Sequence, residues 1–386
     1  MPFATVATVE DMRGLARRRL PRMVFDYIDG AAGEETTARR NRSAMDDVLL
    51  EPQILVDMSR RSLATTLFDR QVAMPVVIGP TGMNGAVWPH GDLCLARAAR
   101  AANVPFVMST AATVELETLV ATAGPLRWFQ LYMLHDRGLA QALLDRVHAA
   151  GFDVLQLTVD TAVSGRRNRD IRNGFTLPFR WTARNLIDTS LHPRWALSML
   201  RAGTPTLRLF SQVVGPMPRG STITEVMQRQ ISNAFTWRDL EWLRSHWKGR
   251  LVLKGLGSIQ QVPLAISAGI DGIVLSNHGG RQLDGAASTI ERLPAIVDAV
   301  AGRMTVLIDG GIRSGTDVAK AIALGADAVQ LGRATLYGLA SGGEVGASHV
   351  LRMLADELDR TMGNCGAHNL ASLRGRAFNA RAADIR

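Results

Sequence analysis

Eight short runs of apolar and β-branched residues recur along this chain, and each is followed by small or polar residues and then a helical pattern. Continuous apolar runs are typical of strands that are buried on both faces, as in a parallel sheet covered by helices. The runs are residues 74–79, 104–108, 127–131, 154–159, 251–253, 272–275, 305–308 and 328–331. Eight strand–helix units in succession predict an α/β fold, the (β/α)8 or TIM barrel.

The segments between the runs have helical spacing, and two of them end at Gly269 and Gly325, where glycine commonly stops a helix. These segments are residues 91–102, 136–150, 259–268, 293–300 and 314–324. Near the N-terminus, Thr8 predicts the start of one helix that continues through Tyr27. Residues 345–361 predict the last barrel helix, followed by a loose tail rich in arginine and alanine.

A barrel can take up most of 386 residues, so we predict a single domain. Its parts are a helical cap (1–70), the barrel (71–163 and 221–362) and a long connection after the fourth strand (164–220). The two cysteines have neither disulfide-framework nor metal-site spacing, which predicts a reducing compartment and no metal. We also expect no signal peptide and no membrane span, because no suitable apolar segment occurs.

Polar residues follow all eight strands, and in such a barrel the carboxyl ends of the strands converge on one mouth. They are Thr81, Gly82, Ser109, Thr110, Gln130, Tyr132, Thr158, Asp160, Lys254, Ser276, His278, Arg281, Asp309, Gly310, Gly311, Gly332 and Arg333. His278 and Arg281 lie three residues apart on a glycine-containing turn, which brings a proton acceptor and an anion-binding group together. That pair suits the oxidation of a 2-hydroxy acid; the alternative is a surface turn with an incidental histidine.

Lys254 closes a buried strand in a chain that has 41 arginines and only three lysines. A compact ammonium group there indicates a cation beside an electron-accepting ring; the alternative is a lysine that extends to solvent from a strand end. The segment 309–315 opens a helix, and Gly332-Arg333 follows the eighth strand. Glycines and helix amides at these two strands predict a phosphate site, which many phosphorylated ligands would fit.

Several segments together resemble the FMN-dependent 2-hydroxy acid dehydrogenase/oxidase family, from about Val9 to Leu358. The segments are residues 25–33, 79–85, 128–132, 157–161, 276–284 and 331–334. The sequences of residues 79–93 and 235–244 are similar to those of the bacterial mandelate members of the family. The sequence of residues 192–196 is similar to that of the membrane-associated lactate members. The segment 276–284 is highly specific, whereas the glycine loops are not.

The resemblance implies FMN as the cofactor and a role for each matched residue. His278 would be the catalytic base, and Asp160 would orient it and stabilise its charged form. The residues implied in catalysis are His278, Asp160, Tyr132, Arg281, Arg167 and Tyr27, of which the two arginines would hold the substrate carboxylate and the two tyrosines would hydrogen-bond the substrate. Those implied in cofactor binding are Thr81, Gly82, Ser109, Gln130, Thr158, Lys254, Ser276, Asp309, Gly311, Arg313, Gly332 and Arg333.

The resemblance favours (S)-mandelate as the substrate and lactate as the alternative. Arg166 stands where a tyrosine is common among mandelate enzymes, and Gly82 stands where the oxidases commonly carry alanine, which favours a dehydrogenase over an oxygen-using oxidase. Tyr27 as an anchor of the cap and Arg167 as one more basic loop residue remain alternatives for those two positions. Two further alternatives for the whole chain are another phosphate-binding barrel enzyme and a non-catalytic membrane adaptor.

Residues 164–220 carry ten arginines and two aspartates, and so hold eight of the nine net positive charges. Apolar residues lie among the arginines: Phe175, Phe179, Trp181, Trp195, Leu197, Met199, Leu200, Leu207, Phe210, Val213 and Val214. This pattern predicts a peripheral membrane patch that delivers electrons to a quinone; an active-site lid or a subunit contact is the alternative. We expect a cytoplasmic protein on the inner face of the membrane, a homotetramer as in relatives, and no nucleic-acid partner, because no binding module accompanies the charge.

Overall fold

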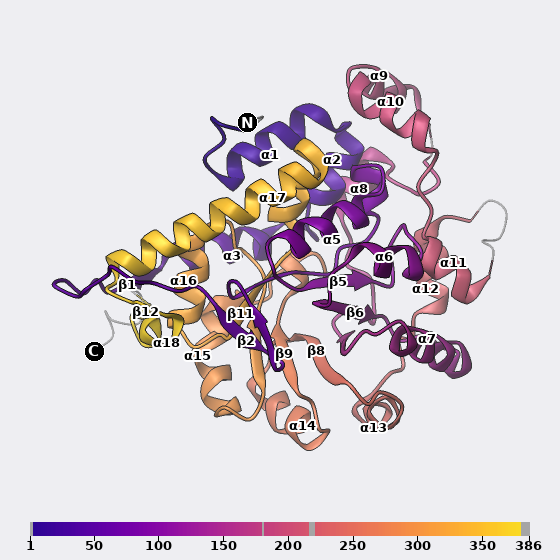
Figure 1. Cartoon of the computed structure of the whole chain (residues 1–386). Helices are drawn as coiled ribbons and strands as arrows, with labels where there is room; N and C mark the ends of the chain where they lie inside the picture. The colour runs from indigo at the N-terminus through magenta and orange to yellow at the C-terminus, as the bar shows by residue number, and fades with distance from the viewer. Residues whose placement is uncertain (1–2, 180, 216–220, 380–386) are drawn as a thin grey trace.

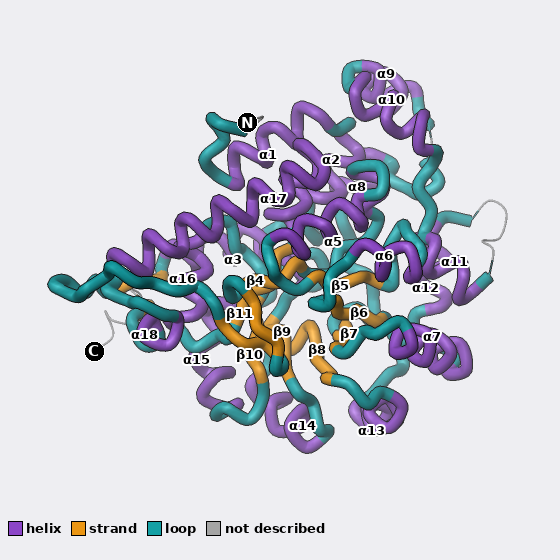
Figure 2. The backbone as a smooth tube through the Cα atoms, in the orientation of Figure 1, coloured by secondary structure: helices purple, strands orange, loops and turns teal. Residues whose placement is uncertain are grey.

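Eight parallel strands close into a barrel at the centre of the computed structural model, which describes residues 3–179, 181–215 and 221–379 (Figures 1 and 2). The strands are β4 (Val76–Ile78), β5 (Phe106–Ser109), β6 (Arg127–Leu131), β7 (Val154–Thr158), β8 (Arg250–Leu256), β9 (Gly272–Leu275), β10 (Thr305–Ile308) and β11 (Ala328–Leu331). Each strand pairs with the next in sequence, and β11 pairs back with β4. The predicted barrel is confirmed, and each strand falls on one of the eight apolar runs.

Helices surround the barrel, because the strands are buried on both faces and need an apolar covering outside. They are α4 (Asn84–Val87), α5 (Gly91–Ala101), α6 (Leu116–Thr122), α7 (Arg137–Ala149), α13 (Trp237–His246), α14 (Val262–Ser267) after the 3-10 turn η1 (Ile259–Gln261), α15 (Thr289–Val300), α16 (Gly315–Ala323) and α17 (Arg333–Asn364). The last of these has non-helical backbone at Gly342 and Gly343, and the part after this kink contains the predicted helix 345–361. It runs across the outside of the barrel and packs on α5 and α16 (Figure 1).

The N-terminal cap begins at the predicted residue but is not one helix. The Thr8 hydroxyl accepts a hydrogen bond from the Asp11 amide and caps α1 (Val9–Arg19). Leu20 then adopts an extended conformation before Pro21, and α2 (Arg22–Asp29) starts afresh. The prediction of a continuous helix through Tyr27 was therefore wrong, because a residue that precedes proline is driven out of the helical region.

Residues 1–70 are also not purely helical. After α3 (Thr36–Asp46) comes β1 (Val48–Leu50), which pairs antiparallel with β12 (Ala377–Asn379), so the tail expected to be loose is ordered up to residue 379. The hairpin β2 (Thr65–Leu67) and β3 (Arg70–Val72) packs Leu67 and Val72 against the inward residues at the amino ends of the barrel strands. This end of the barrel is closed, so a ligand has to enter at the carboxyl ends.

The long connection after β7 contains helices of its own. They are α8 (Asn168–Asn173), α9 (Ala183–Ser190), α10 (Pro193–Ala202) and α11 (Arg208–Val214), and α12 (Ile223–Gln230) follows before α13. Two short elements lie elsewhere: the 3-10 turn η2 (His278–Gly280) after β9, and α18 (Leu370–Leu373) near the C-terminus. The pair α9–α10 projects from the molecule beside the cap (Figure 1). Among the described residues, no helix combines the length and the apolar character needed to cross a membrane.

Candidate functional site

The loops that follow the barrel strands enclose a cavity of about 530 Å³ at the carboxyl end of the barrel. This volume lies within the range of ligand pockets, about 300–1,000 Å³. The predicted site residues that line the cavity are Tyr27, Thr81, Gly82, Tyr132, Arg167, Lys254, His278, Arg281, Asp309, Gly311, Arg313, Gly332 and Arg333. Segments more than 300 residues apart in the sequence thus meet in one space.

The five remaining predicted residues do not line the cavity but lie directly behind it: Ser109, Gln130, Thr158, Asp160 and Ser276. The Ser109 hydroxyl donates to the Gln130 side-chain oxygen at 2.9 Å, and the Ser276 hydroxyl accepts from the Lys254 ammonium at 2.8 Å. Thr158 ends β7 beside Lys254 of β8 in the strand register. Of these contacts, the one from Lys254 to Ser276 reaches a residue that lines the cavity.

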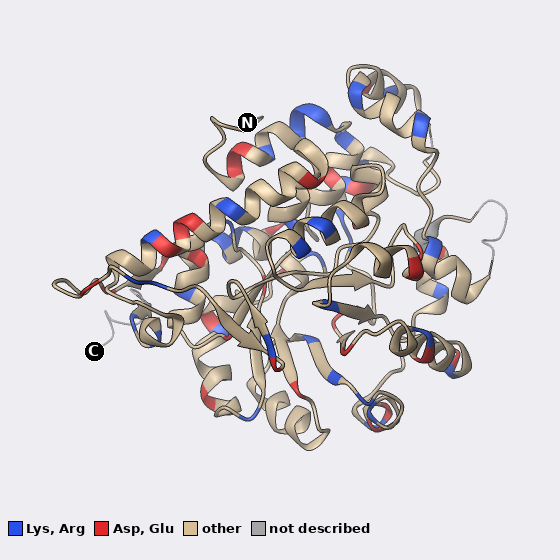
Figure 3. Ribbon diagram, in the orientation of Figure 1, with Lys and Arg blue, Asp and Glu red and all other residues tan. Residues whose placement is uncertain are grey.

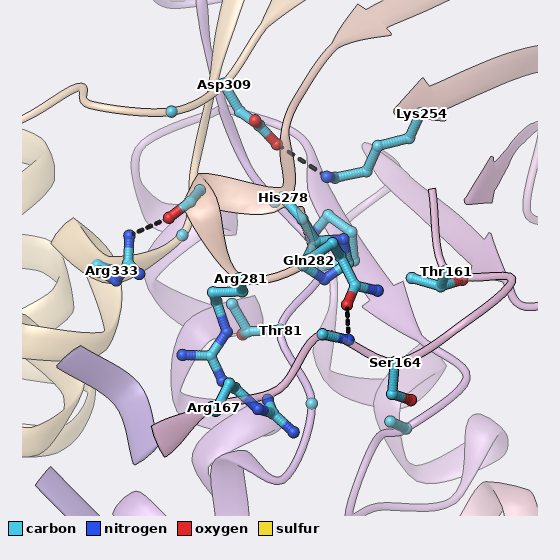
Figure 4. Close-up of a pocket in the computed structure, with 18 of the residues that line it drawn as sticks. Thr81, Thr161, Ser164, Arg167, Lys254, His278, Arg281, Gln282, Asp309 and Arg333 are labelled. Carbon is cyan, nitrogen blue, oxygen red and sulfur yellow. Dashed lines mark hydrogen bonds and ion pairs between the residues drawn. The ribbon is translucent and has the colours of Figure 1, made fainter. Parts of the chain in front are cut away.

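His278 lies at the centre of the cavity, between the lysine and the arginines (Figure 4). Its Nδ1 is 3.0 Å from an Asp160 carboxylate oxygen. Burial would raise the pKa of Asp160, but the charge and hydrogen bond of His278, with Lys254 nearby, bring that pKa below its usual value. An ionised Asp160 therefore fixes the imidazole orientation and leaves Nε2 available for a ligand.

The backbone at His278 adopts a left-handed conformation with φ 57°, and Gly279 follows at φ 65°. A non-glycine residue in this region carries strain that the surrounding structure has to support. The Ser276 hydroxyl accepts from the His278 amide at 3.0 Å and the Asn277 side chain accepts from the Gly280 amide at 3.2 Å. The turn after β9 is thus held in the one conformation that points the imidazole into the cavity.

Two arginines face the same part of the cavity from different loops. The Arg281 and Arg167 guanidinium groups lie 5.2 Å and 5.6 Å from the centre of the Tyr27 ring. Arg281 donates to the Tyr27 and Gly30 carbonyls at 2.7 and 2.8 Å, and Arg167 pairs with Asp170 at 3.0 Å. Burial lowers the pKa of Arg281 to about 10, and the positive charge of Arg167 acts in the same direction. A carboxylate placed between these groups would relieve their repulsion.

The two tyrosines line the same cavity. The Tyr27 ring stacks on Phe175 with centroids 4.4 Å apart, and its hydroxyl lies 3.4 Å from the Gly82 carbonyl oxygen. Burial and the negative charge of Asp160 raise the pKa of Tyr132 well above its usual value. Tyr132 therefore keeps its proton at any physiological pH and can act as a hydrogen-bond donor.

Lys254 is a buried cation with one carboxylate partner on the next strand but one. Its Nζ lies 2.9 Å from Asp309, an ion pair that Figure 4 shows above His278. Burial alone would lower the pKa of Lys254, but attraction to Asp309 and then to Asp160 outweighs it, and the pKa lies above its usual value. The lysine thus presents a permanent positive charge to the cavity, and the alternative of a lysine reaching solvent is excluded because its side chain is buried.

At the other end of the cavity, the loops after β10 and β11 form a basic concavity. Gly310 and Gly311 have φ of 92° and 91°, a conformation that glycine tolerates and other residues rarely adopt. Burial lowers the pKa of Arg313, and the charges of Arg333 and Arg42 act in the same direction. Two half-buried arginines that line the cavity beside Gly310 and Gly311 are suited to bind a phosphate.

Three buried polar atoms in or behind the cavity wall have no hydrogen-bond partner among the described residues. They are the Thr81 hydroxyl, the Gln130 side-chain nitrogen and one Asp309 carboxylate oxygen. A buried polar atom without a partner is costly, by about 1–3 kcal/mol. The three therefore indicate a polar ligand that completes this part of the site.

Other residues of the cavity wall were not predicted from the sequence. The Gln282 side-chain oxygen accepts from the Gly165 amide at 2.7 Å and closes the wall between two loops (Figure 4). Gln330 of β11 and Gln156 of β7 exchange two hydrogen bonds of 3.1 Å across the barrel interior. Gln282 directly follows Arg281 and could have been found from that adjacency, whereas Gln330 lies within an apolar strand and carries no such signal.

A family model described as FMN-dependent dehydrogenase matches residues 16–380. The chain belongs to the FMN-dependent dehydrogenase family. The family, the enzyme class and the FMN dependence predicted from the sequence are thereby confirmed, and the alternatives of another phosphate-binding barrel enzyme and of a non-catalytic adaptor are set aside.

Curated relatives cover nearly the whole of this FMN-dependent dehydrogenase. It is 46% identical over 365 residues to (S)-mandelate dehydrogenase of Pseudomonas putida, over 95% of this chain and 92% of that protein. It is 41% identical over 372 residues to L-lactate dehydrogenase of Yersinia pestis (strain Pestoides F), over 95% of this chain and 97% of that protein.

Solved structures agree with this picture. The crystal structure of the monotopic membrane protein (S)-mandelate dehydrogenase matches with a TM-score of 0.92 and 44% identity, over 97% of this chain and 100% of that one. Mandelate oxidase with (S)-4-hydroxymandelic acid matches with a TM-score of 0.84 and 36% identity, over 97% and 99%.

The cavity of the FMN-dependent dehydrogenase fits its cofactor on three counts. The basic concavity at Arg313 and Arg333 suits the phosphate, and the buried Lys254 suits a ring that gains negative charge on reduction. The unpartnered atoms of Thr81 and Gln130 suit the polar edges of a flavin, and that of Asp309 suits a ribityl hydroxyl.

Proposed function

We propose that this FMN-dependent dehydrogenase oxidises an (S)-2-hydroxy acid to the 2-oxo acid and passes the electrons to a quinone-type acceptor. Mandelate is the favoured substrate and lactate the alternative, as the 46% identical mandelate and 41% identical lactate relatives suggest. The observation that carries the proposal is one cavity lined by His278, Arg281 and Arg167. A base and two cations in that arrangement match a substrate with a hydroxyl beside a carboxylate.

The cofactor would occupy the cavity along its length, with the whole chain acting as one FMN-binding domain. FMN supplies a two-electron acceptor when it is bound. Residues that would contact the flavin ring are Thr81, Gly82, Ser109, Gln130, Thr158 and Lys254. Residues that would line the ribityl-phosphate site are Ser276, Asp309, Gly311, Arg313, Gly332 and Arg333. Lys254 would hold its positive charge against the ring.

The side chains around His278 would carry the proton chemistry. Arg281 and Arg167 would bind the substrate carboxylate, and Tyr27 and Tyr132 would donate hydrogen bonds to the carboxylate or the hydroxyl. His278 would then take one proton from the substrate at Nε2, while Asp160 at 3.0 Å stabilises the imidazolium that forms. Each turnover removes two electrons and two protons from the substrate, and the acceptor takes up the electrons.

The preference for an acceptor other than oxygen is supported at Gly82. Oxidases of the family commonly carry alanine at this position, whereas a Cβ at Gly82 would come within 2.8 Å of the Ala111 Cβ, so the wall of this chain fits glycine. An oxygen-using oxidase is the second candidate function, since mandelate oxidase shares the fold at 36% identity. Reoxidation rates with oxygen and with a quinone distinguish the two.

A peripheral membrane patch on α9 and α10 is the part of the proposal that concerns the acceptor. Leu186, Ile187, Leu191 and Leu200 are 55–81% exposed, and α9 and α10 also contain arginines (Figure 3). Apolar groups beside arginines suit an anionic membrane surface, where each basic residue contributes about 1 kcal/mol. A solved relative is described as a monotopic membrane protein, which supports the same reading.

Part of the predicted patch is not available to lipid. Trp195, Met199, Leu207 and Phe210 are buried against the protein, and the Trp195 indole donates to the Ala86 carbonyl at 2.9 Å. Arg180 and Arg219, which were counted in the basic segment, lie outside the described residues. The patch is therefore narrower than residues 164–220, and we place it on the exposed faces of α9 and α10.

We further propose that the protein is a homotetramer bound to the cytoplasmic face of the membrane. From there the enzyme would reach a quinone acceptor dissolved in the bilayer. Assembly would cover exposed apolar residues elsewhere, such as Ile54 at 82% and Leu55 at 100% exposure. Light scattering of the purified protein, with and without detergent, measures the assembly directly.

The proposal is tested by incubating the yellow protein with both enantiomers of mandelate and lactate and a soluble quinone. We expect phenylglyoxylate from (S)-mandelate in proportion to the quinone reduced, with little product from the (R)-enantiomer. Formation of product from lactate alone would identify lactate, the alternative, as the substrate. The proposal would be overturned if none of the 2-hydroxy acids gave a 2-oxo acid.

A further inference from the structure

Arg169 differs from the other arginines of the basic segment because its guanidinium points inward to three carboxylates. It lies 2.9 Å from Asp29, 3.3 Å from Asp26 and 2.5 Å from Glu35. Its side chain is 32% exposed, so it is held between α8 and the cap and is not free to meet a membrane. The charge of Arg169 is thus neutralised within the protein.

These ion pairs join the helix that follows Arg167 to the helix that carries Tyr27. Arg169 belongs to α8, which starts directly after Arg167, whereas Asp26 and Asp29 flank Tyr27 on α2. A hydrogen bond also joins these two helices, since the Asn173 side chain of α8 donates to Asp26 of α2 at 2.6 Å. Two groups of the candidate substrate site therefore depend on one junction between α2 and α8.

Arg281, the third group of that site, is connected to Arg169 by way of Gly30. A Cβ at Gly30 would lie 2.6 Å from the Asp26 carbonyl oxygen and 3.4 Å from the Arg169 side chain, so the Arg169 stem packs directly over this glycine. The Gly30 carbonyl accepts from Arg281 and from Arg333, each at 2.8 Å. Arg169 thus packs over the glycine that holds Arg281, besides tying Arg167 to Tyr27.

We propose that Arg169 is a positioning residue for substrate binding: it fixes Arg167, Tyr27 and Arg281 relative to one another and touches no substrate itself. The inference rests on the proposed function, because it names what sets the geometry of the carboxylate clamp. A guanidinium can bridge three carboxylates, which a lysine ammonium on a flexible stem cannot do with the same geometry.

Removal of Arg169 leaves the cap with its other interactions, so the variant is expected to fold. Asp29 keeps Arg13, whose nitrogens lie 2.5 and 3.0 Å away, and the Tyr337 hydroxyl at 2.7 Å. Asp26 keeps Arg22 and Asn173. What is lost is the ionic link from α8 to the three carboxylates, while the hydrogen bond from Asn173 to Asp26 remains.

The test compares Arg169→Met and Arg169→Lys with Arg172→Met, a control on the same helix whose side chain is exposed. For Arg169→Met we expect kcat/KM with the best 2-hydroxy acid to fall roughly tenfold to a hundredfold, since a displacement of about 1 Å has effects of this order. Most of the change should be in KM. Arg169→Lys should lie between this variant and the wild type, and Arg172→Met should match the wild type.

Two further readouts separate positioning from general damage. Hydrogen exchange of the amides in residues 166–175 should accelerate in Arg169→Met and not in Arg172→Met, while FMN content and visible spectrum stay unchanged. The uncharged amide of the substrate should lose much less kcat/KM than the acid does, because it has no carboxylate to hold.

An unchanged KM together with unchanged exchange in residues 166–175 would overturn the inference. Equal losses for acid and amide, or loss of FMN, would also overturn it, because they would assign Arg169 a general structural role. If the wild type oxidises no 2-hydroxy acid, the proposed function fails separately, and the exchange experiment still decides whether Arg169 holds the loop of Arg167.

Discussion

At the scale of single residues, the cavity places each ionisable group in a setting that suits one protonation state. Asp160 is ionised beside His278, Lys254 is charged beside Asp309, and Tyr132 keeps its proton. Opposite shifts of neighbouring groups are typical of sites that move protons, although structural ion pairs produce them too. The substitution of His278 separates these two cases, because only a group that moves protons is needed for turnover.

Substitution of the proposed base should stop chemistry and spare the cofactor. In His278→Ala the flavin reduction rate is expected to fall by about 10² to 10⁴, the usual contribution of a general base. FMN content should match the wild type, because His278 lies between the flavin residues and the arginines and does not hold the phosphate. Stopped-flow absorbance measures the rate, and turnover within twofold of the wild type, at about equal FMN content, would show that another residue is the base.

Arg281→Lys should weaken substrate binding more than chemistry. A point charge cannot reproduce the two hydrogen bonds to Tyr27 and Gly30 together with the clamp on a carboxylate. Loss of one hydrogen bond to a charged group costs about 1.5 kcal/mol or more, so KM should rise at least about tenfold. An unaltered KM would remove Arg281 from the clamp.

The pairing of Asp160 should appear in the pH dependence of stability. Its folded pKa lies below its usual value, so the stabilisation it contributes is present above the unfolded pKa of about 3.9. It is lost as the pH falls through the depressed folded pKa. The wild type should therefore exceed Asp160→Asn in unfolding free energy by a constant amount near neutrality, and by less below about pH 4. Urea titrations from pH 3 to 7 measure this, and a difference that grows on acidification would contradict the assigned sign.

At the scale of elements, the strands and the mouth of the barrel followed from local sequence, whereas the closure of its base did not. Strands such as β9 are continuous apolar runs that few other structures accommodate, and polar residues at their ends had to meet. The hairpin β2–β3 was missed because its strands have three residues each and its turn, Phe68-Asp69, lacks the Asn-Gly or Asp-Gly signal.

The site divides in a similar way. His278 and Arg281 were singled out by their spacing in one turn, and Asp160 because it follows the end of a strand; the structure brings all three to the same cavity region. The role of Arg169 was not visible, since its three partners lie more than 130 residues away in sequence. Long-range ion pairs have no local pattern, and only the packing of α8 on α2 brings them together.

The exposed face of α9 gives a prediction at this scale. Replacement of Leu186, Ile187 and Leu191 by serine should lower binding to anionic vesicles at least about tenfold, because each buried leucine or isoleucine contributes about 1.5–3 kcal/mol. Activity with a soluble acceptor should be unchanged. The matched control replaces Ile259 and Leu264, which are 43% and 47% exposed beside β8, and vesicle binding that falls equally in both variants would disprove a localised patch.

At the scale of the whole molecule, the cavity joins the cap, the barrel loops and α17, so cofactor binding should stabilise the entire chain. Arg333, the first residue of α17, connects these three parts. It donates to the Ile28 and Gly30 carbonyls of the cap and to the Gly279 carbonyl of a barrel loop. A ligand that binds only the folded state adds about 2.7 kcal/mol at a hundredfold excess over its dissociation constant. The stability of this protein is thus expected to depend on FMN concentration.

Flavin-stripped protein should therefore show a higher melting temperature when FMN is added. Arg313→Met should reduce that shift, because it removes a charge that we propose binds the phosphate. Arg352→Met, at an exposed position on α17, should leave the shift unchanged. Calorimetry at several FMN concentrations gives the comparison. The same shift in both variants would place the phosphate elsewhere.

The most direct test of the central claim is anaerobic reduction of the yellow holoenzyme by (S)-mandelate. Stopped-flow absorbance measures this reduction in the wild type and in His278→Ala. We predict that the wild type loses its yellow colour at a rate that saturates with substrate, while His278→Ala keeps the colour and the cofactor. A wild type that no 2-hydroxy acid bleaches, or a His278→Ala variant that bleaches as fast, would contradict the account.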